Sequence, residues 1–351
     1  MKTFNDCAVI IACCAALILS GCEHKIAIES VVHPDGSLDR TIMLHNTDSN
    51  KIEKNFLGIS AASGWDVTVQ PLPKRPTEKI KHPEVNITFK RHFASVEDAR
   101  NDTLQNSDSV FQIASTFEKK NRWFYTYVEY TDTYRALNKF NAIPKEHYFT
   151  KEDFAFIERL PAEGTAISKA DSLYLARLNE KIFDHYGTRT IFEELFQHVV
   201  GVVRQYQIGS VWLDTLSKKK EEMYQRFAQG VNGQDGDFLS VVESFGIPLP
   251  AVAKESVQGK TADVERRLEF MSEAYSGKYI HSISMPWAVV ESNADSVVNN
   301  RLFWRPPVVK FLLSDYSMTA TARRMNILPV AVSAVVVFLT IGLFLYRKKG
   351  I

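Results

Sequence analysis

The stretch KIAIESVVHPDGSLDRTIML, residues 25–44, sets the class of the folded body. Apolar residues recur at roughly every second position in 25–32, which is typical of a half-buried strand. In the HPDGS segment that follows, Pro34 fixes one φ angle and Gly36 accepts a positive φ, so a turn is expected there. The strand pattern then returns in 38–44. The stretch therefore predicts a β-hairpin at the start of the body.

Outward from this hairpin, the hydrophobic period divides the body into three parts. Alternation with a period of two continues to about residue 135, and from about 137 to 275 the period becomes helical. In that middle part, Ile191 and Phe192 begin an apolar stripe with helical spacing. Strand patterns return after Gly277. The further predicted strands are 65–69, 85–93, 111–117, 123–130, 279–285, 301–304 and 315–322, with a turn at 119–121.

These periods predict an α+β fold. A β-rich domain is formed from both ends of the body, a mainly helical insertion separates its halves, and one transmembrane helix follows. The predicted segments are a signal peptide (1–21), the two β-rich halves (22–135 and 277–324), the helical insertion (136–276), the transmembrane helix (325–346) and a basic tail (347–351).

The N-terminus has the features of an export signal. One lysine precedes an apolar run at 7–19, which is too short to span a bilayer comfortably. The following Leu19-Ser20-Gly21-Cys22 resembles the lipobox of bacterial lipoproteins. That resemblance implies cleavage between Gly21 and Cys22 and attachment of diacylglycerol to the Cys22 thiol. An ordinary signal peptide with an incidental cysteine is the alternative.

The positions of the cysteines fit that prediction. All four cysteines lie within the first 22 residues. Cleavage would leave only Cys22, and lipid would occupy its sulfur. The mature chain is therefore expected to have no disulfide, no thiolate metal site and no cysteine nucleophile.

The C-terminus predicts a membrane anchor. The 20 residues from Ile327 to Tyr346 carry no charge and would form a helix about 30 Å long, enough to cross a bilayer. Tyr346 falls at the expected interface, and Arg347, Lys348 and Lys349 follow as a cytoplasmic anchor. Because the chain is predicted to be exported, this segment would stop transfer and leave the tail inside the cell.

The composition and the sequence motifs give little indication of nucleic-acid binding, catalysis or metal binding. With 42 Lys and Arg against 41 Asp and Glu, the chain has no general attraction for nucleic acid. Ser217 and Lys220 have the Ser-x-x-Lys spacing of penicillin-recognising acylases without their partner motifs. Glu194 and His198 lie four residues apart, but the second histidine of a zincin motif is missing. We therefore predict no catalytic residue, no metal site and no cofactor.

The densest aromatic run is residues 122–130. Trp123, Tyr125 and Tyr127 alternate and would share one face of a strand. Ordinary packing on a sheet face explains such a run, and a platform for a carbohydrate or a protein partner is the alternative. We retain these three residues as a candidate binding surface.

Several segments resemble the β-domain of membrane-tethered lipoproteins of the mycobacterial LppM type. These are the early turn at 34–37, the late run at 285–298 followed by 302–304, and the terminal helix with its basic tail. Trp287 departs from the pattern, because a glycine commonly follows the proline there. The resemblance covers about 25–45 and 279–346. It implies a non-enzymatic envelope domain and transfers no catalytic residue.

We therefore predict a non-catalytic cell-envelope lipoprotein, held on the outer face of the cytoplasmic membrane as a binding or assembly module. Its expected partners are the lipid bilayer and an envelope protein that contacts the helical insertion. One alternative is an envelope hydrolase of glycan or peptide that uses the Glu152-Asp153 or Glu193-Glu194 pair in a cleft. Another is a lipid carrier, which requires a continuous apolar cavity in the β-domain.

Overall fold

The structure is a computed structural model that describes residues 25–48, 57–72, 84–105, 111–231 and 238–349. The predicted signal peptide, with Gly21 and Cys22, lies outside these residues. The described chain divides into two units. A β-unit comprises 25–135, 279–306 and 315–351, and a helical unit comprises 136–278 and 307–314.

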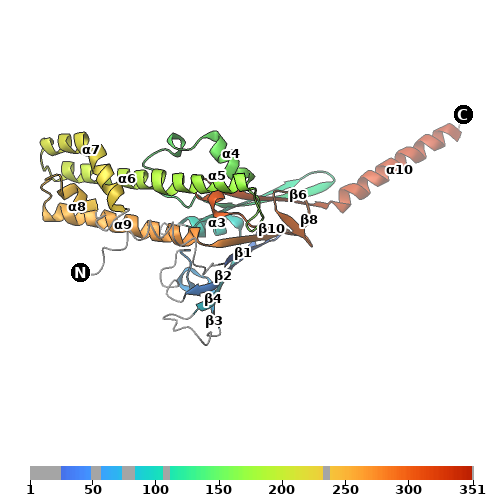
Figure 1. Ribbon diagram of the computed structural model, residues 1–351. Coiled ribbons are helices and arrows are strands. Elements are labelled where there is room, and N and C mark those ends of the chain that lie inside the picture. Colours follow the sequence, from blue (N-terminus) through green and yellow to red (C-terminus); the bar gives the residue numbers. More distant parts are fainter. Residues whose placement is uncertain (1–24, 49–56, 73–83, 106–110, 232–237, 350–351) are drawn as a thin grey trace. The chain divides into compact units, whose positions relative to one another are not determined.

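The β-unit contains two sheets (Figure 1). The first, sheet A, has the strand order β3-β4-β2-β1-β7-β10-β9. Its strands are β1 (Lys25–Val32), β2 (Leu38–Asp48), β3 (Asp66–Pro71), β4 (Glu84–Phe93), β7 (Lys278–Ser284), β9 (Ser296–Val298) and β10 (Arg301–Trp304). The hairpin predicted at 25–44 is confirmed, since β1 and β2 pair from Lys25 with His45 to Val32 with Leu38. Gly36 has the positive φ, 94°, that its turn requires.

The second sheet, sheet B, has the order β5-β6-β11-β8. Its strands are β5 (Ile113–Asn121), β6 (Tyr125–Tyr134), β8 (Ala288–Ser292) and β11 (Tyr316–Met325). Helix α3 (Val96–Gln105) connects β4 to β5. Both sheets combine strands from the two ends of the body, so the predicted α+β fold is confirmed. The turn predicted at 119–121 is displaced, because β5 continues to Asn121 and the chain reverses at 122–124.

The inner faces of the two sheets carry the core of the β-unit. On β6 every second residue is buried, from Thr126 to Tyr134. Tyr134 packs edge-on against Tyr279 of β7, with ring centroids 6.0 Å apart. The alternation inferred from the sequence is thus the alternation between the inner and outer faces of these sheets.

The helical unit lies between the two parts of the β-unit in the sequence. Its helices are α4 (Lys151–Arg159), α5 (Lys169–Glu180), α6 (Thr188–Gln205), α7 (Ser210–Val231), α8 (Phe238–Glu243) and α9 (Ala251–Tyr275). A π-helical segment, Lys181–Gly187, joins α5 to α6 without a break. The short 3-10 turns are Ala61–Ser63 in the β-unit, and Lys145–His147 and Val308–Phe311 in the helical unit.

An apolar core holds the helical unit together. The stripe predicted to begin at Ile191 and Phe192 is buried along α6. Phe192 is fully buried and its ring contacts those of Phe196, Phe227 and Phe238. Burial of these side chains provides the main stabilisation of the unit, since helices of this length are marginal in isolation.

Candidate membrane-interface site

The tip of the β5–β6 hairpin presents adjacent apolar side chains to solvent. The N–H of Arg122 donates a hydrogen bond to the carbonyl of Tyr125 (2.8 Å), which closes the turn. At this turn Trp123 is 62% exposed and Phe124 is 46% exposed. Neighbouring large apolar residues at an exposed turn usually mark a contact with another surface or a membrane.

A single residue, Asn326, connects sheet B to the C-terminal helix α10 (Ile327–Lys349). Its backbone N–H donates to the carbonyl of Phe124 (2.8 Å), and its side-chain amide donates to the carbonyl of Arg122 (2.8 Å). Its side-chain oxygen accepts a hydrogen bond from the Thr126 hydroxyl (2.8 Å). These three bonds fix the start of α10 beside the hairpin tip without a flexible linker.

Helix α10 is the predicted apolar helix. Over Ile327–Lys348 it has a mean hydropathy of 2.6, and none of its most apolar part is buried in the protein. It is long and apolar enough to cross a bilayer. Tyr346 is 80% exposed near its end, where Arg347 and Lys348 follow. The structure thus confirms the helix, and its insertion in a membrane stays a prediction.

The hairpin tip and α10 form a groove. The indole N–H of Trp123 donates to the Ser333 hydroxyl (3.1 Å), so the tip lies beside the second turn of the helix. A groove of about 490 Å³ runs between the two. Its lining is apolar apart from Ser333 and comprises Phe124, Tyr125, Met325, Val330, Ser333, Ala334, Val337 and Phe338.

The predicted aromatic surface is divided by the structure. Tyr125 and Tyr127 are half-buried on the outer face of β6, with ring centroids 6.3 Å apart. Trp123 belongs to the turn, so the three residues do not share one strand face. Trp123 and Tyr125 instead lie beside α10. The strand pairing explains why these residues lie near α10. Met325 at the end of β11 pairs with Tyr125 at the start of β6, and α10 begins two residues after Met325.

Two arginines and a second tryptophan lie at the same edge of sheet B. The Arg323 guanidinium lies over the Tyr125 ring, 4.7 Å from its centroid. The Arg324 guanidinium lies over the ring of Trp287 at the same distance, 4.7 Å. Lys119 approaches Trp287 from β5 (5.8 Å). Sequence reasoning did not join these residues to the aromatic run, because only the register of β5, β6, β8 and β11 brings them together.

A second cluster of functional groups lies between the two sheets. Asp132 of β6 accepts hydrogen bonds from Arg40 of β2 (2.7 Å) and from His281 of β7 (2.9 Å). The hydroxyls of Ser30, Ser115 and Tyr130 also donate to its two oxygens. The side chains of Arg40, Asp132 and His281 are all 0% exposed. We call these six residues the inter-sheet network.

The electrostatics of the inter-sheet network favour an ion pair with a neutral histidine. Burial alone would raise the pKa of Asp132, but the Arg40 charge and the His281 hydrogen bond outweigh it and hold that pKa well below its usual range. Burial lowers the pKa of His281, against the opposing effect of Asp132. A neutral His281 donates its Nε2–H to Asp132, while its Nδ1 accepts the Tyr134 hydroxyl proton at 2.9 Å.

The inter-sheet network resembles a hydrolytic triad in composition but not in arrangement. In a triad the histidine bonds both the carboxylate and the nucleophilic hydroxyl. Here Ser30 and Ser115 donate directly to Asp132, and His281 bonds Tyr134 instead. The bonds of the network link the two sheets. Because its side chains are buried, a substrate could not reach either serine.

Three of the four carboxyls proposed for a hydrolase, those of Asp153, Glu193 and Glu194, are paired with cations. Asp153 caps α4 by accepting from the Thr150 N–H (2.9 Å) and pairs with Lys181 (2.8 Å). Glu193 pairs with Lys220 (2.6 Å). Burial opposes ionisation of Glu194, but Arg267 and Lys260 prevail and lower its pKa.

A glycosidase needs one carboxyl with a raised pKa as its general acid. The pKa of Asp153 is lowered as well, since Lys181 and the cap outweigh its desolvation. The exposed Glu152 also has a lowered pKa, caused by hydrogen bonds at the start of α4. These three carboxyls are therefore shifted in the direction opposite to that required.

The other motifs have structural roles. Lys220, of the Ser-x-x-Lys spacing, is the ion-pair partner of Glu193 and lies over the Phe196 ring. The His198 Nε2 lies 3.2 Å from both the carbonyl and the hydroxyl oxygen of Ser256, so it bonds α9. Within the part of the chain that the structure describes, no group of three His, Cys, Asp or Glu residues is placed to hold a metal ion.

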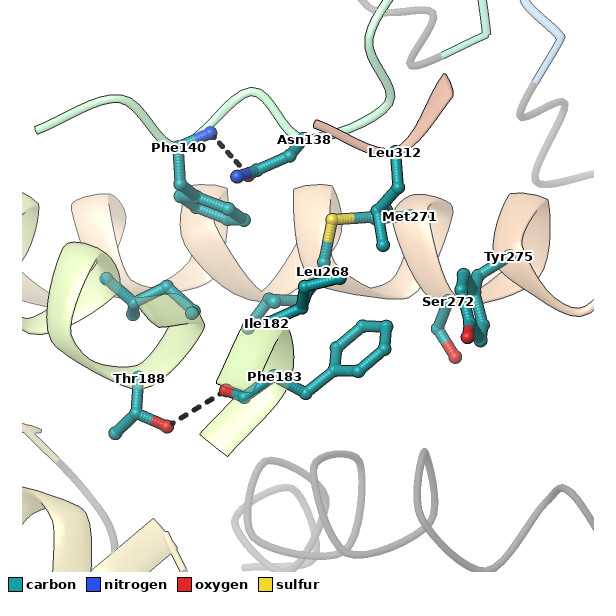
Figure 2. A pocket seen from close by; sticks show the side chains of 12 residues that line it. Asn138, Phe140, Ile182, Phe183, Thr188, Leu268, Met271, Ser272, Tyr275 and Leu312 are labelled. Carbon is teal, nitrogen blue, oxygen red and sulfur yellow. Dashed lines mark hydrogen bonds between the residues drawn. The ribbon is translucent and has the colours of Figure 1, made fainter. Parts of the chain in front are cut away.

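The helical unit contains a small apolar cavity (Figure 2). Phe140, Leu268, Met271 and Leu312 surround it, together with residues of the π-helical segment. Its volume is about 40 Å³, enough for a few waters but far below the roughly 300 Å³ of a small-molecule pocket. We therefore assign the cavity to imperfect packing around the π-helical segment.

Comparisons with known proteins leave the family open. No protein-family model matches the chain, and no curated protein matches its sequence. Among solved structures, it is similar to the NMR structure of the folded domain of Mycobacterium tuberculosis LppM. The identity is 7%, the TM-score is 0.28, and the match covers 88% of this chain and 94% of that domain. A similarity of this degree is too low to transfer a function.

Proposed function

We propose that this protein is a non-catalytic cell-envelope lipoprotein that holds a binding or assembly module at the outer face of the cytoplasmic membrane. The observation that carries the proposal is the junction at Asn326. It joins an exposed apolar helix of membrane-spanning length to a folded β-unit through one residue with three hydrogen bonds. Such a junction keeps the β-unit at the bilayer surface.

The anchoring part of the proposal is tested by membrane extraction. In the full chain, α10 should resist alkaline carbonate, since a spanning helix is not released by breaking surface contacts. Diacylglycerol on Cys22 brings two acyl chains, which would retain the deleted chain as well, so both forms are made with residues 1–22 replaced by a cleavable secretory signal that carries no lipid. Deletion of 327–351 should then make the protein extractable. Identical extraction of the two forms would contradict a spanning helix.

The lipoprotein part depends on Cys22. Changing Cys22→Ser should abolish incorporation of labelled lipid and leave an uncleaved precursor, because the lipidated thiol is what the lipobox resemblance implies. Cys14→Ser is a matched control inside the predicted signal peptide and should change neither property. Unchanged labelling of the Cys22 variant would contradict lipidation.

The binding part of the proposal places the partner on the helical unit. Three of its four candidate acids are engaged in ion pairs and its cavity is small, which supports a contact surface over an active site. Val211 and Val252, 71% and 58% exposed at the starts of α7 and α9, are positions for photo-crosslinking side chains.

The test is crosslinking in intact cells, with identification of the captured proteins. A reproducible envelope protein captured from these two positions supports the proposal. Capture only by the same crosslinker placed on the outer face of β4, for example at Lys90, would contradict the placement of the partner on the helical unit.

A specific observation disfavours the lipid-carrier alternative. A carrier requires a continuous apolar cavity in the β-unit, but the space between the sheets contains the fully buried ion pair of Arg40 and Asp132. An acyl chain beside these charges would remove polar contacts without replacing them.

A further inference from the structure

We propose that the hairpin tip and the base of α10 form a binding site for one anionic phospholipid of the leaflet that α10 enters. The headgroup would bind Arg323, and one acyl chain would occupy the groove lined by Phe124 and Val337. This inference rests on the proposed membrane insertion of α10. It adds a specific ligand to what is otherwise only an anchor.

The depth of the hairpin tip follows from helix geometry. Ser333 lies six residues after Ile327, which is about 9 Å along the helix axis. Its hydroxyl accepts the indole N–H of Trp123. If residues 327–346 of α10 span the roughly 30 Å of hydrocarbon, the hairpin tip must lie in the hydrocarbon just below the headgroups of the leaflet that α10 enters. Tryptophan is enriched at this depth, where its ring is apolar and its N–H finds a polar partner.

Cations surround the tip where headgroups would lie. Arg122, Arg323 and Arg324 are exposed. Both Arg323 and Arg324 lie over aromatic rings, and among the described residues neither has a carboxylate partner. The nearby Glu118 and Glu129 are both engaged by Lys120, at 3.0 and 2.7 Å. A phosphate is the natural ligand for such guanidinium groups, because it accepts two parallel hydrogen bonds.

The groove is continuous with this basic site. Tyr125 lines the groove and carries the Arg323 guanidinium over its ring. A single lipid could therefore place its headgroup at Arg323 and its chain against Phe124 and Val337. The groove, at about 490 Å³, lies in the size range of small-molecule sites. Lipid is the occupant that the surroundings favour, since α10 carries the groove into the bilayer.

Native mass spectrometry of the purified full chain tests the site. The chain is released from nanodiscs containing phosphatidylglycerol and phosphatidylcholine, and the lipid that stays bound is counted. We expect one phosphatidylglycerol to be retained in preference to phosphatidylcholine. Arg323→Gln with Arg324→Gln should reduce that retention by about tenfold or more, because charge-assisted hydrogen bonds are lost.

Two further variants make the result specific. Phe124→Ser should also reduce retention, since it removes a wall of the groove without changing charge. Arg347→Gln with Lys348→Gln removes the same charge at the opposite end of α10 and should leave retention unchanged. Equal losses from the two double variants would overturn the proposal in favour of general charge attraction. Dimers in place of bound lipid would overturn it in favour of a second copy in the groove.

Failure of the site can be distinguished from failure of the anchor. Carbonate extraction of the chain made without the Cys22 lipid, reconstituted in vesicles, reports on α10 alone. A chain that is extracted contradicts the proposed function. A chain that resists extraction but retains no phosphatidylglycerol contradicts only the lipid site. The substituted side chains are exposed, so the circular dichroism and thermal unfolding of each variant should match those of the wild type.

Discussion

The cores of the two units of this protein differ in their polar content. In the helical unit, the buried cluster consists of apolar side chains around Phe192, with residues such as Leu216 and Val257 from neighbouring helices. In the β-unit, a fully buried ion pair between Arg40 and Asp132 joins the sheets. Apolar packing tolerates many arrangements, whereas a buried charge requires each of its partners. Two cores that are buried to a similar degree can therefore differ in how strictly they specify their side chains.

The largest expected effect is at Asp132. Changing Asp132→Ala leaves the Arg40 guanidinium buried without its counter-ion, which should destabilise the β-unit by about 3–5 kcal/mol. Hydrogen exchange of β6, measured by mass spectrometry during denaturation of the full chain in micelles, reports this loss. The double variant Arg40→Met, Asp132→Leu should recover much of it. A double variant as unstable as Asp132→Ala would show that the pair is not coupled in this way.

The matched change in the helical unit is Leu216→Ala. Leu216 is 0% exposed in the apolar cluster, so its truncation should cost about 3 kcal/mol through lost burial and a residual cavity. The loss should be seen in the hydrogen exchange of α6 and α7. Leu216→Met should cost less than about 1.5 kcal/mol, because it conserves volume. A Met variant as unstable as the Ala variant would contradict the tolerance expected of an apolar core.

The two cores should also differ in their response to pH. Burial lowers the pKa of His281, so the folded β-unit keeps it neutral below the usual 6.5 while the unfolded chain takes up a proton. The unfolded state then binds more protons, and stability should fall as the pH is lowered from about 6.5 to 5, by up to about 1.4 kcal/mol per pH unit.

Denaturation at several pH values, followed in β6, measures this slope. His281→Gln should flatten it, leaving the contribution of His45, whose pKa is also lowered, by burial and by Lys25. A slope that is unaffected by His281→Gln would show that another group titrates.

The smallest expected effect is at the junction with α10. Asn326→Ala removes the side-chain bonds to Arg122 and Thr126, which should cost about 1 kcal/mol or slightly more. Hydrogen exchange at the hairpin tip should rise while the rest of β6 is unchanged. Ser317→Ala, at the other end of β11, is a control for loss of a polar contact on the same strand. Unchanged exchange at the tip would show that the backbone bond of Asn326 is sufficient.

Local patterns were enough for the fold class but not for the sites. The alternation in 85–93 and the stripe beginning at Ile191 predicted the types of their elements, because hydrophobic period reflects one buried face. Arg40 lies two residues before the buried Ile42 on β2 and is itself buried, but no sequence pattern indicated its partner. Asp132 and His281 are separated from it by 92 residues or more. No local rule pairs such distant side chains.

The membrane-interface site shows the same limit. The run at 122–130 predicted exposed or face-packed aromatic residues, but it placed the turn a few residues too early and put Trp123 on a strand. The turn is set by the register of β5 with β6, in which Asn121 pairs with Thr126. The register of β6 with β11 brings Arg323 over Tyr125.

Composition and short-range period were enough for the strand or helical character of the described segments and for the apolar helix at 327–346. They also show that cysteine is confined to the first 22 residues. Which side chains meet depends on the tertiary structure. It enclosed Arg40, Asp132 and His281 between two sheets, and it held the Trp123 turn against α10 through Asn326. These contacts depend on strand register and sheet packing, which are set by the whole chain.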